Sequence, residues 1–511
     1  MKTVAKLYSA ELDGINAELI EVEADLNVGL HSFNIVGLAD KAVSEAKERV
    51  NSALKNCGIK PPTKENRRIT VNLAPADIKK AGSRFDLPIA LAYLLASEQL
   101  KPFKTDDKIF VGELSLDGAL RPINGSLNIA ILAKRKGIKY VFVPEMNAAE
   151  AAILQEIQVV PVKNLNQLIE HLEEIKIIPP QAKTNLNPGY SSSFVELSEI
   201  KGQPTAKRAL LVAAAGGHHL LMSGPPGTGK TMLAQTLISI LPPPSLEECV
   251  EITGIYSAAG LNRDLPFMNF RPFRAPHHTA SGTAIIGGGQ NPRPGEISLA
   301  HRGVLFFDEA PEFHRDILEA LRQPLESGTI HVARAKKSIT LPAKFMFIAA
   351  MNPCPCGYFE DPEKECRCSA NEIFRYQKKI SGPLMDRLDI QIIVPRIPIE
   401  ELRKEKAENI EDSFRKQVAA AREIQKERFL AIKPKIYGNA EMSSKQVDEF
   451  VKLDAQAENF LKKTLERAFV SARGYYRILK IAKTIADLEA SPNVKTEHLA
   501  EAFQYRIKTN E

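Results

Sequence analysis

The 511-residue chain is too long for one ordinary domain, because domains average roughly 150 residues, and its length predicts about two to four of them. Hydrophobic residues make up 44% and charged residues 25%, which is typical of a globular protein and excludes a mostly disordered one. No apolar run approaches the roughly 18 residues of a membrane-spanning helix, and the acidic N-terminal stretch is not typical of a secretory signal. The sequence therefore predicts a soluble, multidomain, cytoplasmic protein without a membrane partner. Its net charge of +6, spread over this length, identifies no partner by itself.

Composition divides the chain into four regions. Residues 1–172 mix β-rich runs with helical stretches, and residues 173–195 are rich in Pro, Asn, Gly and Ser, which predicts a linker. Residues 196–400 carry apolar strands followed by helices, a pattern that predicts a parallel sheet covered on both faces. Residues 401–511 are charged and helical. Their apolar residues at helical spacing are Ile478, Ile481, Ala482, Ile485 and Leu488.

Residues 224–231 have the pattern of a phosphate-binding loop, G-x-x-x-x-G-K-[ST], between an apolar strand and a predicted helix. Glycines let the backbone N–H groups face the β-phosphate, the Lys reaches the β- and γ-phosphates, and the Thr hydroxyl ligates Mg²⁺. The sequence therefore predicts an ATP and Mg²⁺ site. Its residues are Gly224, Pro225, Pro226, Gly227, Thr228, Gly229, Lys230 and Thr231.

Two later apolar strands end in polar residues. The first ends in Asp308 and Glu309; beside a phosphate loop, Asp308 would hold the Mg²⁺ and Glu309 would polarise the attacking water. The alternative is a pair of acids at a helix N-terminus. The second strand ends in Asn352, which is expected to reach the γ-phosphate or the water, unless it only forms an Asx turn before Pro353.

Together with the stretch GPLMDRLD (382–389), these motifs resemble the AAA+ ATPases of the magnesium-chelatase/MCM branch. Within that branch the chain resembles the ComM/YifB family over essentially its whole length. The resemblance rests on the phrases FRAPHHTAS (273–281), PRPGEISLAHRGVLFFDE (292–309), AAMNPCPCGY (349–358) and SARGYYRILKIAKTIADL (471–488).

The resemblance implies an α/β ATPase core with a C-terminal helical lid, assembled as a homo-hexameric ring with ATP between subunits. Arg387 matches the arginine finger, which neutralises charge developing on a neighbour's γ-phosphate, and Arg473 matches the sensor arginine of the lid, acting in its own subunit or the next. The alternative for both is a surface or helix-capping cation. The implied activity is an ATP-driven DNA motor for branch migration of recombination intermediates in natural transformation.

Two segments are candidates for DNA contact. Residues 285–295 carry a Gly- and Pro-rich tip that predicts a projecting hairpin, and residues 331–338 predict a second hairpin with cations near its turn. In a ring helicase such loops line the pore and contact phosphates without reading the base sequence. The alternative is a solvated hairpin edge. The cations concerned are Arg293, Arg334, Lys336 and Lys337.

Four of the six cysteines lie within residues 354–368: Cys354, Cys356, Cys366 and Cys368. In a chain without an export signal this cluster predicts a structural Zn²⁺ site, because four thiolates complete a tetrahedron and leave no open position. Tight C-x-C pairs can also be redox-active, and buried thiols can be inert. Cys57 and Cys249 stand alone and are expected to be simple core or surface thiols.

Residues 1–172 resemble the Lon-protease domain, an α+β fold of the ribosomal S5-like type. Lon enzymes use a Ser–Lys dyad, but the matching positions here are Asp86 and Leu127, which cannot perform acyl transfer. Ser83 and Ser126 lie near these positions. The domain is therefore expected to be non-proteolytic. Two other functions remain as alternatives: a chelatase-type ATPase that remodels a protein partner, although the chain lacks a D-x-S-x-S motif, and, less favoured, an ATP-dependent protease.

Overall fold

The computed structural model describes residues 4–64, 66–191, 195–262, 266–289, 292–334, 337–402, 410–433, 435–467 and 471–506. The chain folds into two compact units. The first comprises Met1–Asn187, Leu246–Met268 and Asn291–Pro294, and the second comprises Pro188–Ser245, Asn269–Gln290 and Gly295–Glu511. Among the described residues no helix is long and apolar enough to span a bilayer.

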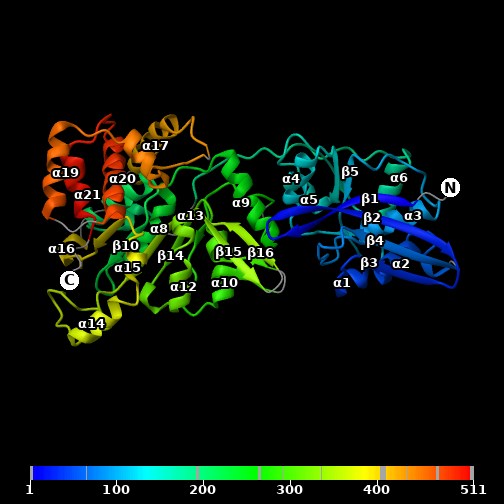
Figure 1. The fold of residues 1–511 in the computed structure, drawn as a ribbon, viewed down its shortest axis with the longest axis horizontal. Helices are drawn as coiled ribbons and strands as arrows, with labels where there is room; N and C mark the ends of the chain where they lie inside the picture. The colour runs from blue at the N-terminus through cyan, green and yellow to red at the C-terminus, as the bar shows by residue number, and fades with distance from the viewer. Residues whose placement is uncertain are drawn as a thin grey trace. The chain divides into compact units, whose positions relative to one another are not determined.

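The first unit contains a four-stranded sheet with the order β1-β2-β4-β3 (Figure 1). Its strands are β1 (Ala5–Asp13), β2 (Asn16–Val28), β3 (Ser32–Val36) and β4 (Arg67–Ala74). From Ile20 to Leu26 every second residue of β2 is buried, the alternation expected of a sheet with one covered face. The helix α3 (Asp86–Ala96) packs on β1 and β2, and α2 (Ala46–Asn56) packs on α3.

A second, parallel sheet of this unit has the order β5-β8-β9. Its strands are β5 (Lys108–Phe110), β8 (Tyr140–Pro144) and β9 (Gln158–Val162). The remaining elements are α1 (Lys41–Ser44), β6 (Glu113–Leu114), β7 (Leu120–Arg121), α4 (Ser126–Lys136), α5 (Glu145–Ala151) and α6 (Leu165–Leu172). The strands β6 and β7 pair with each other, so this unit is an α+β fold with a four-stranded, a three-stranded and a two-stranded sheet.

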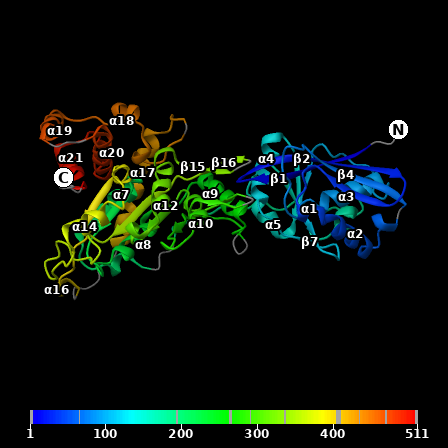
Figure 2. The same ribbon diagram turned by 60° about the horizontal axis from the view of Figure 1, so that its bottom comes forward.

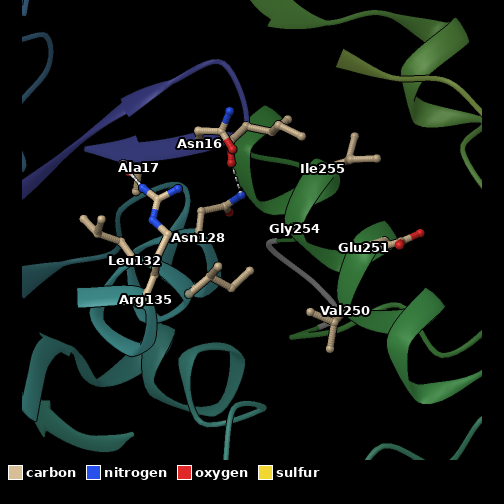
Figure 3. Close-up of a pocket in the computed structure, with 11 residues that line it drawn as sticks. Asn16, Ala17, Asn128, Leu132, Arg135, Val250, Glu251, Gly254 and Ile255 are labelled. Atoms are coloured by element: carbon tan, nitrogen blue, oxygen red, sulfur yellow. Dashed lines mark hydrogen bonds between the residues drawn. The ribbon is translucent and has the colours of Figure 1, made fainter. Parts of the chain in front are cut away.

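The helix α9 (Leu246–Ala259) belongs to the first unit although it follows the phosphate-loop helix in sequence. It packs against α4, where Gly125 N donates to the carbonyl oxygen of Ser257 at 3.1 Å. Between the two helices and the β1–β2 turn lies a pocket of about 180 Å³, lined in part by Asn128 and Gly254 (Figure 3). The sequence places this helix within the predicted 196–400 region, and in the structure it packs with the first unit.

The second unit is built on a five-stranded sheet with the order β11-β14-β17-β10-β18, in which every neighbouring pair is parallel. Its strands are β10 (Leu220–Ser223), β11 (Phe273–Arg274), β14 (Val304–Phe307), β17 (Met346–Met351) and β18 (Ile390–Ile393). All residues of β14 and β17 are buried. A parallel sheet covered on both faces, as predicted, is confirmed.

Helices of this unit pack against the sheet, and several of them are labelled in Figure 2. The helices of the unit include α7 (Pro204–Gly216), α8 (Lys230–Ile240), α10 (Gly282–Ile286), α11 (Glu296–Leu299), α12 (Arg315–Ala320), α13 (Pro324–Ser327), α14 (Ala370–Gln377), α15 (Gly382–Met385) and α16 (Ile399–Leu402). A separate antiparallel hairpin joins β15 (Thr329–Arg334) and β16 (Lys337–Pro342). The short strands β12 (Gly287–Gly288) and β13 (Arg293–Pro294) flank the other predicted tip.

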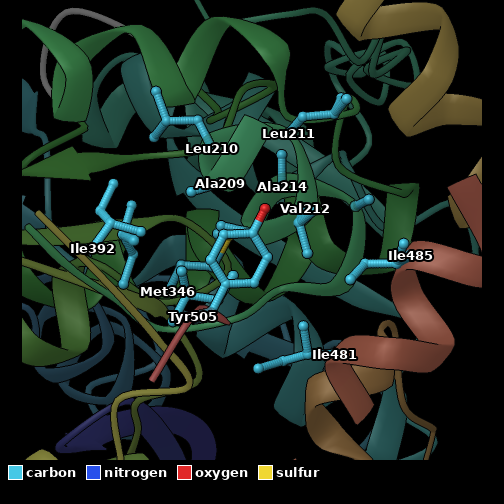
Figure 4. Packing of buried hydrophobic residues seen from close by; sticks show 14 of the residues in the cluster. Ala209, Leu210, Leu211, Val212, Ala214, Met346, Ile392, Ile481, Ile485 and Tyr505 are labelled. Atoms are coloured by element: carbon cyan, nitrogen blue, oxygen red, sulfur yellow. The ribbon is translucent and has the colours of Figure 1, made fainter. Parts of the chain in front are cut away.

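The C-terminal region is helical, as its sequence predicts. Its helices are α17 (Ile410–Arg428), α18 (Ser444–Phe450), α19 (Ala455–Arg467), α20 (Ala472–Leu488) and α21 (Thr496–Gln504). The predicted apolar stripe of α20 is buried at Ile478, Ile481 and Ile485, and it packs in one core with α7 (Figure 4). This core continues into β10, so the helical region and the phosphate-loop strand share one hydrophobic cluster.

Candidate active site

The phosphate loop predicted at residues 224–231 connects β10 to α8. Gly227 and Gly229 adopt positive φ angles of 79° and 83°, a backbone conformation that strains residues with a β-carbon. A β-carbon on Gly224 would overlap the carbonyl oxygen of Val394. Glycine is therefore required at all three positions, and the loop opens directly into a helix N-terminus, the site at which backbone N–H groups bind phosphate.

Two hydrogen bonds tie the middle of the loop to its surroundings. Thr228 Oγ1 donates to the Pro225 carbonyl oxygen at 3.0 Å, and Gln203 Nε2 donates to the Thr228 carbonyl oxygen at 3.1 Å. Pro226 at the tip is exposed. Hydrogen bonds thus fix the middle of the loop, while Pro226 remains partly accessible to solvent.

Lys230 is buried, and its ammonium group donates to three oxygens of the site. These are the carbonyl oxygens of Gly224 at 2.7 Å and Pro225 at 2.8 Å, and Oδ1 of Asn352 at 3.3 Å. Burial lowers the pKa of Lys230 to about 8, and the negative charge of Asp308 opposes this shift. The lysine is therefore held at the loop by neutral acceptors that phosphate oxygens can replace.

Thr231 and Asp308 meet although they lie far apart in sequence. The Thr231 hydroxyl donates to Oδ2 of Asp308 at 2.7 Å, because α8 starts at the carboxyl end of β10 and Asp308 follows β14 in the same parallel sheet. A hydroxyl and a carboxylate are hard oxygen ligands of the kind Mg²⁺ prefers. The two residues predicted to hold Mg²⁺ therefore fit that ion.

Glu309 follows Asp308 in the left-handed region, with a φ of 49°. Its side chain is 56% exposed, so its carboxylate is accessible to water, and its backbone N donates to Oδ1 of Asp308 at 3.0 Å. The imidazole Nδ1 of His278 lies 3.9 Å from Glu309 Oε2. A left-handed backbone at a residue other than glycine is strained, and strain of this kind often occurs at functional sites.

Arg387 and Arg473 converge on one carboxylate, that of Glu326 in α13. Arg387 is buried, and it donates to Glu326 and, at 2.7 Å, to the Pro383 carbonyl oxygen. Arg473 is 57% exposed and donates to the other Glu326 oxygen at 3.2 Å. The hydrogen bond from Arg387 is the main cause that holds the pKa of Glu326 below its usual value. Two arginines from distant parts of the sequence thus form one cluster.

The four cysteines predicted as metal ligands also come together. Their sulfur atoms all lie within 4.8 Å of one another. Cys354 Sγ lies 3.3 Å from Cys356 Sγ and 3.7 Å from Cys366 Sγ, and Cys356 Sγ lies 3.6 Å from Cys366 Sγ. Tetrahedral zinc with Zn–S bonds of about 2.3 Å places its sulfurs about 3.8 Å apart, so this donor set fits zinc.

The positions that match the Lon dyad are structural. Asp86 is fully buried and pairs with Arg49 Nε at 2.6 Å; burial raises the pKa of Asp86 to about 6, against the opposing effect of Arg49. Leu127 is fully buried in α4. Neither side chain is a nucleophile or a base for acyl transfer, which agrees with the expectation of a non-proteolytic domain.

The candidate DNA contacts fall in both units. Arg293 is exposed on β13 of the first unit, and the hairpin β15–β16 belongs to the second. Arg334 and Lys337 are paired opposite each other at the end of that hairpin, while Lys336 lies outside the described residues. The predicted second hairpin is confirmed, and the tip of the first lies outside the described residues.

Sequence reasoning missed two residues of the site. Glu326 carries no motif, and only the fold reveals that it joins two arginines. His278 lies in the segment FRAPHHTAS, which contributes only to the family resemblance. Its position beside Glu309 follows from the pairing of β11 with β14.

Comparison with known proteins gives matches over nearly the whole chain. The family models are those of magnesium chelatase subunit ChlI over residues 196–402, subunit ChlI of Mg-chelatase over residues 22–147, and the C-terminal part of magnesium chelatase subunit ChlI over residues 409–506. The competence protein ComM of Haemophilus influenzae is 43% identical over 511 residues, which cover 99% of this chain and 97% of that protein.

One further relative matches the chain over nearly its full length, and another matches about a third of it. The protein YifB of Salmonella typhimurium is 42% identical over 507 residues, covering 99% of this chain and 97% of its own. The Lon protease of Chloroflexus aurantiacus is 28% identical over 180 residues, covering 34% of this chain and 21% of the protease. With identity of this extent over its full length, the chain belongs to the ComM/YifB family of magnesium-chelatase-like AAA+ ATPases.

Proposed function

We propose that the protein hydrolyses ATP as a hexameric ring in the cytoplasm and uses the energy to drive branch migration of DNA recombination intermediates. The observation that carries the catalytic part is the contact between Thr231 and Asp308 at 2.7 Å, next to the exposed carboxylate of Glu309. It unites the three chemical groups that ATP hydrolysis needs at the end of one parallel sheet: a phosphate loop, a pair of Mg²⁺ ligands and a base.

Each residue has a distinct role in this proposal. Thr231 and Asp308 hold Mg²⁺, which neutralises phosphate charge when bound. Lys230 exchanges its carbonyl partners for the β- and γ-phosphate oxygens. Glu309 would orient and polarise the attacking water, and Asn352, which accepts from Lys230 at 3.3 Å, would reach the γ-phosphate or that water.

The arginine pair supports action between subunits. Arg387 and Arg473 form one cluster at Glu326, and the exposed guanidinium of Arg473 is accessible to a neighbouring subunit. In the ring, Arg387 acts as the finger and Arg473 as the sensor on the neighbour's nucleotide, where fixed positive charge stabilises the transition state.

DNA as the substrate is supported by the hairpin and by a relative. Arg334 and Lys337 end the paired strands of the hairpin β15–β16, with Lys336 between them in sequence. Together with the exposed Arg293 they supply cations for phosphate contacts without base readout. The relative with 43% identity carries the name competence protein, which favours a role in natural transformation.

The same proposal gives the four-cysteine cluster a structural Zn²⁺. The four sulfur atoms lie within 4.8 Å of one another, and four thiolate ligands close the coordination sphere of the metal. A metal held in this way would stabilise the loop that carries it, and its closed coordination sphere would leave no open position for catalysis.

ATP hydrolysis measured with and without Holliday-junction, forked and linear DNA tests the proposal, together with branch migration of the labelled junction. We expect DNA to stimulate ATP hydrolysis. We expect the junction to be separated into its duplex products only when ATP is present. A rate of ATP hydrolysis that does not change when DNA is added would instead indicate a chelatase-type ATPase with a protein partner. ATP-dependent degradation of casein would indicate a protease.

A further inference from the structure

The segment that carries the four cysteines has little packing of its own. Residues 353–369, all of them described, contain neither helix nor strand, and only Cys354 and Gly357 among them are buried. Arg396 secures its middle through two ion pairs, with Asp361 Oδ2 at 2.8 Å and with Glu363 Oε2 at 3.7 Å. Hydrophobic burial on this scale cannot offset the conformational entropy of fixing so many residues, so the loop needs a cross-link to keep one conformation.

The start of this loop lies beside the nucleotide site, and the helix that follows the loop packs back on that start. Asn352, the acceptor of Lys230, directly precedes Pro353 at the start of the loop. The loop ends at Ser369, which begins α14 with a capping box, and Gln377 at the far end of α14 donates back to the Pro353 carbonyl oxygen at 3.0 Å. The helix thus returns to the start of the loop and closes it against the end of β17.

The middle of the loop touches the phosphate loop itself. Gly357 has a positive φ of 83°, and a β-carbon placed on it would lie 2.7 Å from Cδ of Pro226 and 3.9 Å from Cγ of Asn352. Backbone and proline ring are therefore in direct contact. Gly357 N also donates to the Cys354 carbonyl oxygen at 3.0 Å, so the turn that reaches Pro226 starts at a predicted metal ligand.

We propose that zinc bound by the four thiolates controls the affinity of the phosphate loop for nucleotide. The metal joins Cys354 and Cys356 to Cys366 and Cys368, and this fixes the turn that presses Gly357 against Pro226. Loss of the metal releases the turn, and the phosphate loop then loses a neighbour that holds it in the binding conformation. This inference rests on the proposed nucleotide and zinc sites, and it adds that the first depends on the second.

The test uses the full-length protein and the affinity of a fluorescent ATP analogue, measured without any need for hydrolysis. Zinc is first quantified by elemental analysis of protein purified without added metal, with about one ion expected per chain. The zinc is then removed by a chelator and restored. We expect removal to weaken nucleotide binding by about tenfold or more and restoration to recover it.

Two variants separate the metal from the contact. Cys366→Ser with Cys368→Ser should lose zinc and bind nucleotide as weakly as the stripped protein, whereas Cys57→Ser, at a lone thiol outside the cluster, should retain both properties. Gly357→Ala keeps all four thiols but strains the turn and crowds Pro226. It should retain zinc and still bind nucleotide less tightly, and this variant does not depend on the folding of a metal-free protein.

Each other result would overturn a defined part of the inference. Wild-type protein without zinc would remove the metal site. Zinc that can be removed with no change in nucleotide affinity would overturn the coupling and leave the proposed function intact. Failure of the zinc-loaded wild-type protein to bind nucleotide would overturn the proposed function, and with it this inference.

Discussion

Arg387 is held by Glu326, and the same carboxylate accepts a hydrogen bond from Arg473. The buried guanidinium of Arg387 and the exposed one of Arg473 are therefore oriented by a single side chain that is itself 56% exposed. A carboxylate that fixes two cations in this way sets the direction of both and limits their movement. The relationship gives Glu326 a positioning role that can be measured.

Glu326→Gln should lower the rate constant of ATP hydrolysis by about tenfold to a hundredfold while nucleotide affinity changes little, because misplaced charge affects the transition state more than binding. Steady-state kinetics measure the rate constant, and binding of a fluorescent ATP analogue measures the affinity. Glu423→Gln, which removes an exposed carboxylate paired with Lys426 on α17, is the control. An unchanged rate constant in Glu326→Gln would show that Glu326 does not position the two arginines for hydrolysis.

Arg387→Ala should leave nucleotide binding largely intact but reduce hydrolysis by roughly a thousandfold or more, the scale of a lost arginine finger. Because the guanidinium comes from a neighbour in the proposed ring, mixing with Lys230→Ala subunits should restore activity at interfaces that join an intact loop to an intact finger. Activity of the mixture above the sum of the two variants supports action between subunits. If mixed rings form and stay inactive, either Arg387 acts within its own chain or the whole ring is required.

Glu309→Gln should bind ATP and Mg²⁺ normally but turn over about a hundredfold more slowly, because the amide cannot accept a proton from water. The side chain is exposed, so the substitution should not disturb folding, and thermal unfolding checks this point. Slow turnover should also accumulate ATP-bound assemblies, visible by size-exclusion chromatography with ATP. Wild-type turnover would refute the role of Glu309 as the base.

Nucleotide affinity should depend on pH through Lys230. Since burial lowers its pKa to about 8, the free protein loses the positive charge above that pH, whereas bound phosphate stabilises the charged form. Affinity should therefore be complete below pH 8 and fall by up to about tenfold per pH unit above it. Titrations from pH 7.5 to about 9.5 measure the slope.

Lys230→Arg is the control for that titration, because a guanidinium stays protonated over this range. The variant should bind nucleotide more weakly, since the planar guanidinium does not reproduce the geometry of the ammonium group. Its affinity should not vary with pH. If the affinity of Lys230→Arg varied with pH, a group other than Lys230 would cause the pH dependence. If the affinity of the wild-type protein did not vary with pH, the prediction would be wrong.

Much of the nucleotide site was predictable because the residues that form it lie in short, contiguous sequence motifs. The glycines and Lys230 define the phosphate loop, and the rule that parallel strands share one carboxyl edge brings Asp308 and Asn352 to it. The apolar spacing of Ile478, Ile481 and Ile485 likewise predicts the buried face of α20, which the structure confirms.

Contacts between distant segments were not predictable in the same way. Glu326 is one glutamate among many, and its two arginines are joined only by tertiary folding. The contact of Gly357 with Pro226 depends on the path of a loop without regular structure. Local periodicity indicates which face of a helix is buried but not which partner covers it, so only the structure shows that α9 packs on α4.

The insertion of α9 into the first unit has a consequence for any attempt to separate the two units genetically. The chain passes from one unit to the other five times, so a cut at the predicted linker severs only one of these passages. An isolated fragment ending at Asn187 would lack α9 and leave the face of α4 that it covers in water, while the remaining fragment would carry the buried Cys249 and Ile252 of α9 without their partners. Neither unit is one continuous stretch of the sequence, so neither can be exchanged between relatives as a single segment.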